Sequence, residues 1–174
     1  APELGADVER ARRDLAFVVE LAAIRMNRFT RYDVDGVSGL DDETAAAAYR
    51  AAFRARGLDP ADPAALGRAV AASAVRRELV AALDDWAIVE PDAGAAARLL
   101  DAARRADPGA WTDRFRDPTA RADPAELDRL ARTAEPRSLD PAVMFALADL
   151  MRRRDRDAGE LLAAAQLAHP DDFL

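Results

Sequence analysis

The chain contains neither cysteine nor lysine among its 174 residues. Without cysteine it can form no disulfide and no thiolate metal site, which fits a reducing compartment, and we expect a cytoplasmic protein. Without lysine it cannot use the phosphate-binding lysine of P-loop proteins, the strand lysine of protein kinases or a Schiff-base lysine. Those three kinds of catalytic site are therefore excluded for this chain.

Long apolar runs are also missing. No stretch approaches the roughly 20 apolar residues of a membrane span, and the start, APELGADVER, lacks the basic and then apolar segments of a signal peptide. We therefore expect no membrane contact from this segment. Because the chain begins with Ala1 rather than methionine, we expect it to be an excised piece or a processed product.

Positive charge is not concentrated anywhere. All 25 basic residues are arginine, and they are interleaved with 32 acidic residues, which gives a formal net charge of −7. Nucleic-acid binders usually gather positive charge into a patch or stripe, so we expect no nucleic-acid partner. Alanine makes up about a quarter of the chain, and this composition favours helices.

Six of the ten prolines follow an aspartate, at 59/60, 62/63, 107/108, 117/118, 123/124 and 140/141. An aspartate at the N-cap accepts hydrogen bonds from unpaired amides of the first helical turn. Proline at the first helical position loses no bond, because its missing N–H would have had no partner there. We predict that most of these pairs begin helices.

Apolar residues recur at spacings of three and four throughout, which predicts an all-α fold. We expect helices over residues 7–29, 42–56, 93–106, 108–115, 124–134, 141–153 and 158–168, a short helix after Asp62-Pro63, and one over 74–90 that Ser73 caps. In the second helix we expect Tyr49 to stack on Phe53 and Gly57 to end the helix.

The first helix carries one apolar stripe at the spacing of a helical hairpin or a short coiled coil, formed by Val8, Ala11, Leu15, Val18, Ala22 and Met26. We predict that this stripe packs against a second helix in one of these two arrangements. We expect a single domain over residues 1–174, with an N-terminal hairpin over 7–57 that contains an acidic loop at 30–42. Helical regions over 62–115 and 124–174 follow.

Those two regions contain an internal repeat. AAARLLDAARRADP, residues 95–108, aligns with DAGELLAAAQLAHP, residues 157–170, and the preceding ALDDW aligns with ALADL. Each copy predicts a helix–turn–helix unit, and the second fits the tetratricopeptide pattern of about 34 residues. We therefore expect antiparallel helix pairs stacked as an α-solenoid. Ala142 and Asp149 stand where that pattern prefers tryptophan and tyrosine.

Five segments together resemble a known family: VERARRDLAFVVELAAIRM, AAYRAAFRARGLD, VRRELVAALDDWA, RADPGAWTDRFRD and HPDDF. They are similar to the helical region that follows the kinase domain in large bacterial eukaryotic-like Ser/Thr kinases, from about Val8 to Phe173. The resemblance implies stacked helices that lead into tetratricopeptide repeats and serve as an interaction and regulatory arm. It carries over no catalytic residue, because the matching positions are packing and capping positions.

The acidic stretch RYDVDGVSGLDDET, residues 31–44, raises the possibility of calcium binding by Asp33, Asp35 and Asp42. If Gly36 is the sixth residue of a calcium loop, Arg31 is the first, and arginine cannot ligate calcium. We favour an acidic connection that ends in an N-cap aspartate, with negative charge placed near the positive end of the next helix. Low-affinity cation binding is the alternative.

Other candidate residues favour structural roles. His169 is the sole histidine and lies in a turn, without partners in the sequence for general-base chemistry. Asp84 and Asp85 are adjacent, so they point about 100° apart on a helix and do not form an acid–base pair. We expect both to be solvated or to cap a neighbour. Trp86 and Trp111 could line a groove, but core positions are the favoured interpretation.

Two functions from different classes remain. The favoured one is a non-catalytic helical-repeat module that binds a protein or another part of its own polypeptide, with no cofactor. The second is a small all-α hydrolase or lyase that uses carboxylates, which would require acids from separate helices to converge in one pocket.

Overall fold

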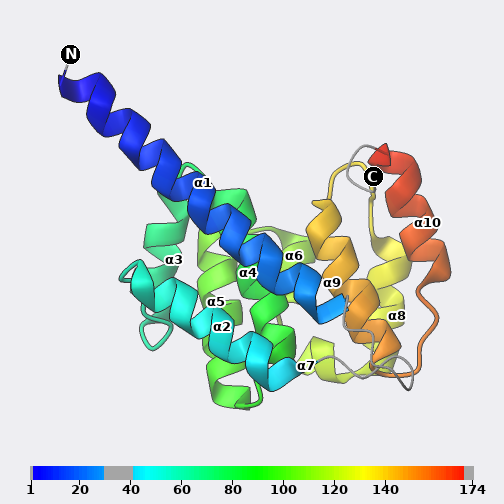
Figure 1. Ribbon diagram of the computed structural model, residues 1–174. Helices are drawn as coiled ribbons and strands as arrows, with labels where there is room; N and C mark the ends of the chain where they lie inside the picture. Colours follow the sequence, from blue (N-terminus) through cyan, green and yellow to red (C-terminus); the bar gives the residue numbers. More distant parts are fainter. Residues whose placement is uncertain (1, 30–40, 171–174) are drawn as a thin grey trace, which may run out of the picture. The chain divides into compact units, whose positions relative to one another are not determined.

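The computed structural model describes residues 2–29 and 41–170, and within that part the chain is helical throughout and contains no strand (Figure 1). The all-α prediction is confirmed, including a long N-terminal helix. The helices are α1 (Pro2–Phe29), α2 (Asp42–Ala55), α3 (Pro63–Ala71), α4 (Arg76–Val89), α5 (Ala93–Ala106), α6 (Ala110–Phe115), α7 (Pro118–Ala122), α8 (Pro124–Thr133), α9 (Pro141–Arg152) and α10 (Gly159–Ala168).

The chain divides into two compact units, which are described separately. The first unit, residues 1–106, contains α1 to α5, and the second, residues 107–174, contains α6 to α10. In the first unit α1 packs on α2 and α4, while α5 packs on α3 and α4. In the second unit α9 contacts both α8 and α10. The expectation of a single domain over residues 1–174 stays a prediction.

Four of the six Asp-Pro pairs begin helices as predicted. The aspartate side chain accepts hydrogen bonds from first-turn amides at the starts of α3, α7, α8 and α9, that is at Asp62, Asp117, Asp123 and Asp140. The remaining two pairs do not. Asp59 instead accepts from the amide of Ala61 in a turn, and α6 begins at Ala110 after a Gly109 N-cap that provides no side-chain hydrogen bond.

The start of α4 also differs from the prediction. Its N-cap is Val75, which makes no side-chain capping bond. Ser73 lies two residues earlier, where its hydroxyl accepts a hydrogen bond from the Val75 amide at 3.2 Å. The serine therefore shapes the turn that leads into the helix, because Ser side chains bond to backbone groups two residues on as readily as they cap.

The core of the first unit is built around Trp86, which is fully buried. Tyr49 stacks on its ring at 6.1 Å and Phe53 lies tilted against it at 5.4 Å. The expected stacking of Tyr49 on Phe53 is wrong, because each of these buried rings instead has the indole as a ring partner. Phe17 of α1 contacts Phe53 edge-on at 5.3 Å. One aromatic cluster therefore joins α1, α2 and α4.

The buried face of α1 is not the predicted one. Val8, Leu15 and Met26 are exposed, whereas Phe17, Leu21 and Arg28 are buried on the opposite side of the helix. Spacing alone could not choose between the two faces, because both repeat with the helical period. Among the described residues, no helix combines the length and the apolar composition needed to cross a membrane.

Two glycines have specific tasks in the first unit. Gly57 has φ +70°, and the amides of Gly57 and Leu58 bond back to the carbonyls of Arg54 and Phe53, which ends α2 in a Schellman motif as predicted. Gly67 lies where α3 meets α5. A Cβ there would stand 2.7 Å from the Cβ of Arg105, so the close approach of these helices requires glycine.

The second unit has its own apolar interior. Phe115, Leu127, Leu130, Met144 and Leu147 are fully or almost fully buried there. Trp111 stacks on Phe115 at 5.8 Å, as its spacing predicts. Each unit therefore has an interior of the kind that lets a compact domain persist on hydrophobic burial.

The Asp-Pro caps predict a stability effect that can be measured at α8. We expect Asp123→Ala to lower the free energy of unfolding by about 1 kcal/mol, because the Ala125 amide loses its acceptor. Asp123→Ser restores an acceptor and should recover most of the loss. Urea unfolding followed by circular dichroism measures both. An Asp123→Ser variant as unstable as Asp123→Ala would contradict the capping role.

Candidate functional site

A hollow surface of the second unit lies between α8 and α10. One hollow of about 650 Å³ lies along the first part of α10, and a second of about 540 Å³ adjoins it. The two share the lining residues Ala134, Pro136 and Ala164. We call the pair the α8–α10 groove. Its small and apolar lining residues are Ala131, Ala134, Pro136, Met151, Leu161, Ala164, Leu167 and Ala168, and its charged ones are Asp128, Arg132, Glu135, Arg137, Arg156, Asp157 and Glu160.

One end of the groove is closed by an ion pair. The guanidinium of Arg156 donates hydrogen bonds to both carboxylate oxygens of Asp128, one of them at 3.0 Å. These bonds lower the pKa of Asp128, so its carboxylate stays charged. Arg156 follows Asp155, whose φ of +56° makes the sharp turn between α9 and α10. The turn therefore places the guanidinium opposite α8.

The other end is tied by His169. Its Nε2 donates a hydrogen bond to the carbonyl of Pro136 at 2.6 Å, which joins the end of α10 to the connection between α8 and α9. The structural role predicted for this histidine fits that contact. Asp128 and Pro136 lie 28 and 33 residues from their partners, so the two ties hold α10 against a distant part of the chain.

The groove stays open between these ties because small side chains line it. Ala131 and Ala134 on one side and Ala164 on the other all line the hollow. Leu161 is buried at the floor, whereas Leu167 is strongly exposed. Arg132 and Arg137 lie on the rim and are also exposed. The site thus offers apolar side chains interspersed with charged ones.

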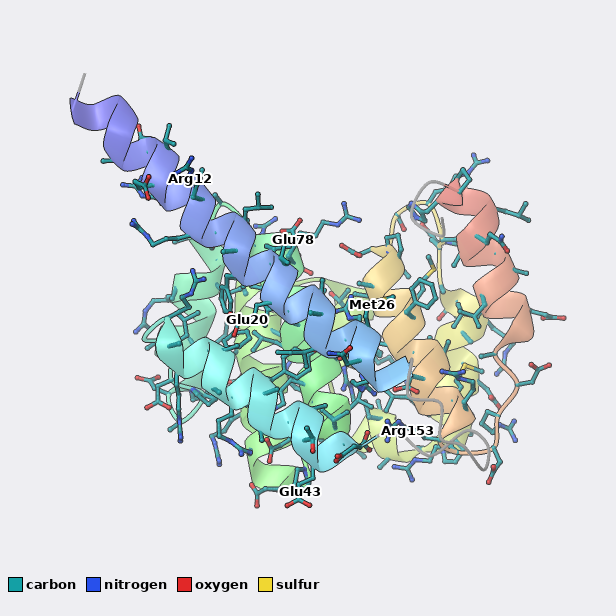
Figure 2. All side chains as sticks on the ribbon, viewed as in Figure 1. Arg12, Glu20, Met26, Glu43, Glu78 and Arg153 are labelled. Atoms are coloured by element: carbon teal, nitrogen blue, oxygen red, sulfur yellow. The ribbon has the colours of Figure 1, made fainter. Side chains whose placement is uncertain are left out.

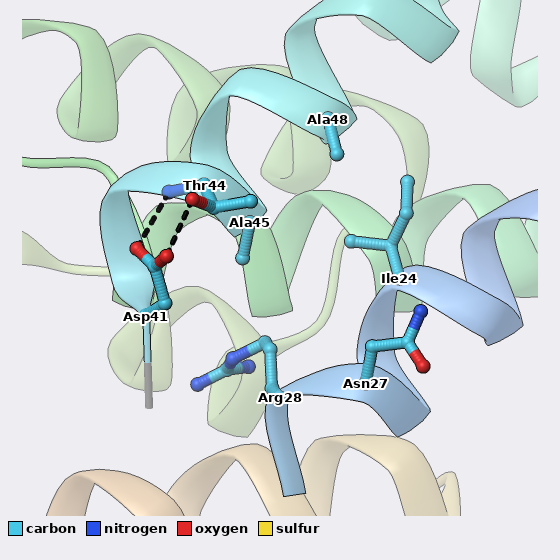
Figure 3. A pocket seen from close by; sticks show the side chains of 7 residues that line it. All are labelled: Ile24, Asn27, Arg28, Asp41, Thr44, Ala45 and Ala48. Carbon is cyan, nitrogen blue, oxygen red and sulfur yellow. Dashed lines mark hydrogen bonds between the residues drawn. The ribbon is translucent and has the colours of Figure 1, made fainter. Parts of the chain in front are cut away.

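A separate hollow, of about 410 Å³, lies between α1 and α2 in the first unit (Figure 3). Asp41 lines it as the N-cap of α2, where its carboxylate accepts from the Thr44 amide at 3.0 Å and from the Thr44 hydroxyl at 2.5 Å. Asp42 and Glu43 follow in the first turn. The predicted helix start with negative charge at its positive end is confirmed.

Calcium binding by Asp33, Asp35 and Asp42 stays an alternative. Asp33 and Asp35 lie outside the described residues. Asp42 is the first residue of α2. In the part of the chain that the structure describes, no group of three acidic or histidine side chains is arranged to hold a metal ion.

Sequence reasoning was wrong about Asp84 and Asp85, which are both buried rather than solvated. The carboxylate of Asp85 lies in the core, where one oxygen pairs with the guanidinium of Arg28. The other oxygen accepts the hydroxyl of Tyr49 at 2.6 Å. Both oxygens are therefore bound by donors from α1 and α2. A charge can be buried in this way only if partners replace the water it loses.

Tyr49 is held as a neutral phenol. Burial raises its pKa far above the usual value near 10, and the negative charge of Asp85 beside it adds to the shift. The phenol is therefore a hydrogen-bond donor rather than a nucleophile at neutral pH. It secures α2 to the carboxylate on α4.

Two further buried acids, Glu90 and Glu126, also have arginine partners. Glu90 accepts from Arg50 at 2.8 Å and from the indole of Trp86 at 3.0 Å. Glu126 pairs with Arg114 and Arg129, and the bond from Arg114 lowers the pKa of Glu126. A general acid needs a raised pKa, so this change runs opposite to the requirement of catalysis.

The tryptophans meet the core interpretation to different degrees. Trp86 is buried at the centre of the first unit, as predicted. Trp111 is only half-buried, although it stacks on Phe115. Neither ring lines the α8–α10 groove. The residues that do line it were missed by sequence reasoning, because alanines spaced along two helices give no signal beyond helix formation.

The Tyr49–Asp85 bond predicts a pH dependence of stability. The unfolded chain releases the Tyr49 proton near pH 10, whereas the folded chain retains it because the pKa is raised. The stability contributed by this neutral phenol is complete below pH 10 and is lost as the pH rises above it. Tyr49→Phe should remove that alkaline loss and cost about 1–3 kcal/mol at neutral pH, because Asp85 loses a donor.

The measurement is urea unfolding at neutral and alkaline pH in a Trp111→Phe background, so that the fluorescence of Trp86 reports on the first unit alone. Tyr49→Phe and its parent are compared. Equal alkaline losses of stability in the two proteins would contradict the assignment.

Comparison with protein-family models, with curated proteins and with solved structures finds no match to this chain. The functional interpretation therefore rests on two features of the structure itself. One is the α8–α10 groove, and the other is the set of buried carboxylates that pair with arginines.

Proposed function

We propose that this chain is a non-catalytic helical module that binds a segment of protein in the α8–α10 groove. The observation that carries the proposal is the hollow between α8 and α10, lined by small and apolar side chains together with charged ones, whose sides are tied together by Arg156 with Asp128 and by His169 with Pro136. A groove whose sides are fixed in this way is preorganised, and preorganisation lowers the cost of binding.

The form of the groove suits a peptide more than a small molecule. Its two hollows join at Ala134, Pro136 and Ala164, so the site is elongated. Its apolar wall includes the exposed Leu167, which a bound segment can cover. A partner is expected to place apolar side chains over the alanines and polar groups at the arginines of the rim.

Solenoid-like stacking of antiparallel helix pairs is part of the same proposal. It is supported by the packing of α9 on both α8 and α10 and of α5 on α3 and α4. Two aligned pairs of the internal repeat are buried in both copies, Leu99 with Leu161 and Ala103 with Ala165. A stack of this kind exposes extended helical surfaces for binding.

The resemblance to the arm of bacterial Ser/Thr kinases leads to a cytoplasmic regulatory role. In such a protein the groove would receive another segment of the same polypeptide or a separate protein. The lack of cysteine is compatible with that compartment.

A carboxylate-based hydrolase or lyase is the less supported function. It needs acids from separate helices that are free to exchange protons in one pocket. Asp85 does lie inward, but both its oxygens are bound by Arg28 and Tyr49. Asp128, which does line the groove, is held charged by Arg156. The arrangement suits anchoring of helices better than acid–base chemistry.

Peptide selection tests the groove. Peptides enriched from a random display library on the full chain should bind it, and Ala164→Glu should weaken that binding about tenfold or more, because it puts a charge into an apolar wall. Ala163→Glu is the matched control, since Ala163 is exposed on the same helix and does not line the groove. Isothermal titration measures both variants.

The proposal fails if no peptide is enriched, or if the enriched peptides bind Ala164→Glu as tightly as the parent chain. Circular dichroism of both variants establishes that the helices persist, so that a loss of binding reports on the groove.

The kinase-arm proposal has its own measurement, the coding DNA on either side of this segment. We expect an upstream reading frame that encodes a Gly-rich loop, a strand lysine and a catalytic-loop aspartate in frame with it. A start codon immediately before Ala1 would reduce the resemblance to one of architecture.

A further inference from the structure

A second apolar surface, separate from the groove, runs along α1. Val8, Leu15, Val19 and Met26 are 47%, 64%, 59% and 60% exposed. Large apolar side chains scattered singly on a surface are ordinary, but these four share one helix. Arg12 and Met26, labelled in Figure 2, lie toward the two ends of this row.

The exposed row lies opposite the face that holds α1 in its unit. At 100° per residue, the four exposed side chains fall within a narrow sector, and Phe17, Leu21 and Arg28 fall about 180° away from it. Those three are buried against α2 and α4. In Figure 1 the N-terminal half of α1 projects beyond the other helices of its unit. The helix therefore has one face occupied by its own unit and one left apolar.

The exposed row has the spacing of a coiled-coil seam. Successive steps of three and four residues lead through Val8, Arg12, Leu15, Val19, Ala22 and Met26. Such a seam of alternating three- and four-residue steps packs against a second helix. From Val8 to Met26 it is about 27 Å long at 1.5 Å per residue, and positions beside it carry the small residues Ala11, Ala16 and Ala23, which permit close approach.

The seam is complementary to itself when two copies run antiparallel. With position numbers that add to 34, the layers are Leu15 with Val19, Arg12 with Ala22, and Val8 with Met26, each occurring twice. Each layer joins a longer side chain (Leu15, Arg12 or Met26) to a shorter one (Val19, Ala22 or Val8). The long stem of Arg12 crosses the small Ala22. Its guanidinium then reaches solvent, as arginine at such a boundary does.

The parallel arrangement lacks this fit. Arg12 would face Arg12 of the second copy, which brings like charges together, and Ala22 would face Ala22, which leaves a void. Charge and size therefore both favour the antiparallel pair.

We propose that two copies of this chain associate through the exposed seam of α1, antiparallel, with Leu15 of each packed on Val19 of the other. This surface lies in the first unit and shares no residue with the α8–α10 groove of the second unit. The closed two-fold pair uses the same patch on both copies, which stops assembly at the dimer.

Sedimentation equilibrium of the full chain tests association. The parent chain should dimerise, and Leu15→Glu should raise the dimer dissociation constant about tenfold or more, since it places two charges in the central layers. Leu15 is largely exposed in the single copy, so the variant should keep its helical circular dichroism. Ala47→Glu, at an exposed position of α2, is the control and should dimerise like the parent. A monomeric parent, or a dimer that Leu15→Glu leaves intact, overturns the proposal.

Disulfide trapping tests the orientation, and the absence of native cysteine keeps it free of background. A mixture of Val8→Cys and Met26→Cys chains should form a disulfide-linked heterodimer on mild oxidation. Val8→Cys alone should not, because its two sulfurs would stand about 27 Å apart along the antiparallel pair. Efficient linking of Val8→Cys with itself, or none in the mixture, overturns the antiparallel register.

Discussion

The carboxylate of Asp85 is the point on which the first unit depends. It is buried on α4 and bound by Arg28 of α1 and by Tyr49 of α2, so one side chain joins three helices. Removing one partner of such a pair leaves a buried charge without compensation, which is far more costly than losing the pair as a whole. The aromatic cluster around Trp86 packs beside these contacts, and the charge fixes which faces of the helices meet.

That same interaction explains what the sequence could and could not predict about α1. Helix positions followed from local signals: periodic apolar residues, aspartate caps and Gly57. The orientation of α1 did not, because it carries an apolar row on each of two opposite faces. The deciding contact joins Arg28 to a residue 57 positions away, and no local pattern contains such a pair. The burial of Asp84 and Asp85 was also missed. Acidic residues on a helix are ordinarily exposed to solvent, and the sequence does not show the distant donors that bind Asp85.

The groove of the second unit was likewise only partly predictable from the sequence. The Asp-Pro caps of α8 and α9 were predictable because an N-cap bonds to amides within its own first turn. The hollow between α8 and α10 depends instead on Arg156 reaching Asp128 and His169 reaching Pro136. His169 was recognisable as a structural residue, but its partner was not. Alanine is uninformative in a sequence, yet here its small size is what leaves the groove open.

Several carboxylates are buried beside the apolar core, and each of Asp85, Glu90 and Glu126 pairs with an arginine. Apolar side chains are left outside, in the α8–α10 groove and along the seam of α1. Buried ion pairs favour one arrangement of helices rather than adding much net stability. Exposed apolar surface, by contrast, gains free energy only when something covers it. The proposals of a bound peptide and of a second copy both rest on this exposed surface, because covering it releases the free energy that the single chain leaves unused.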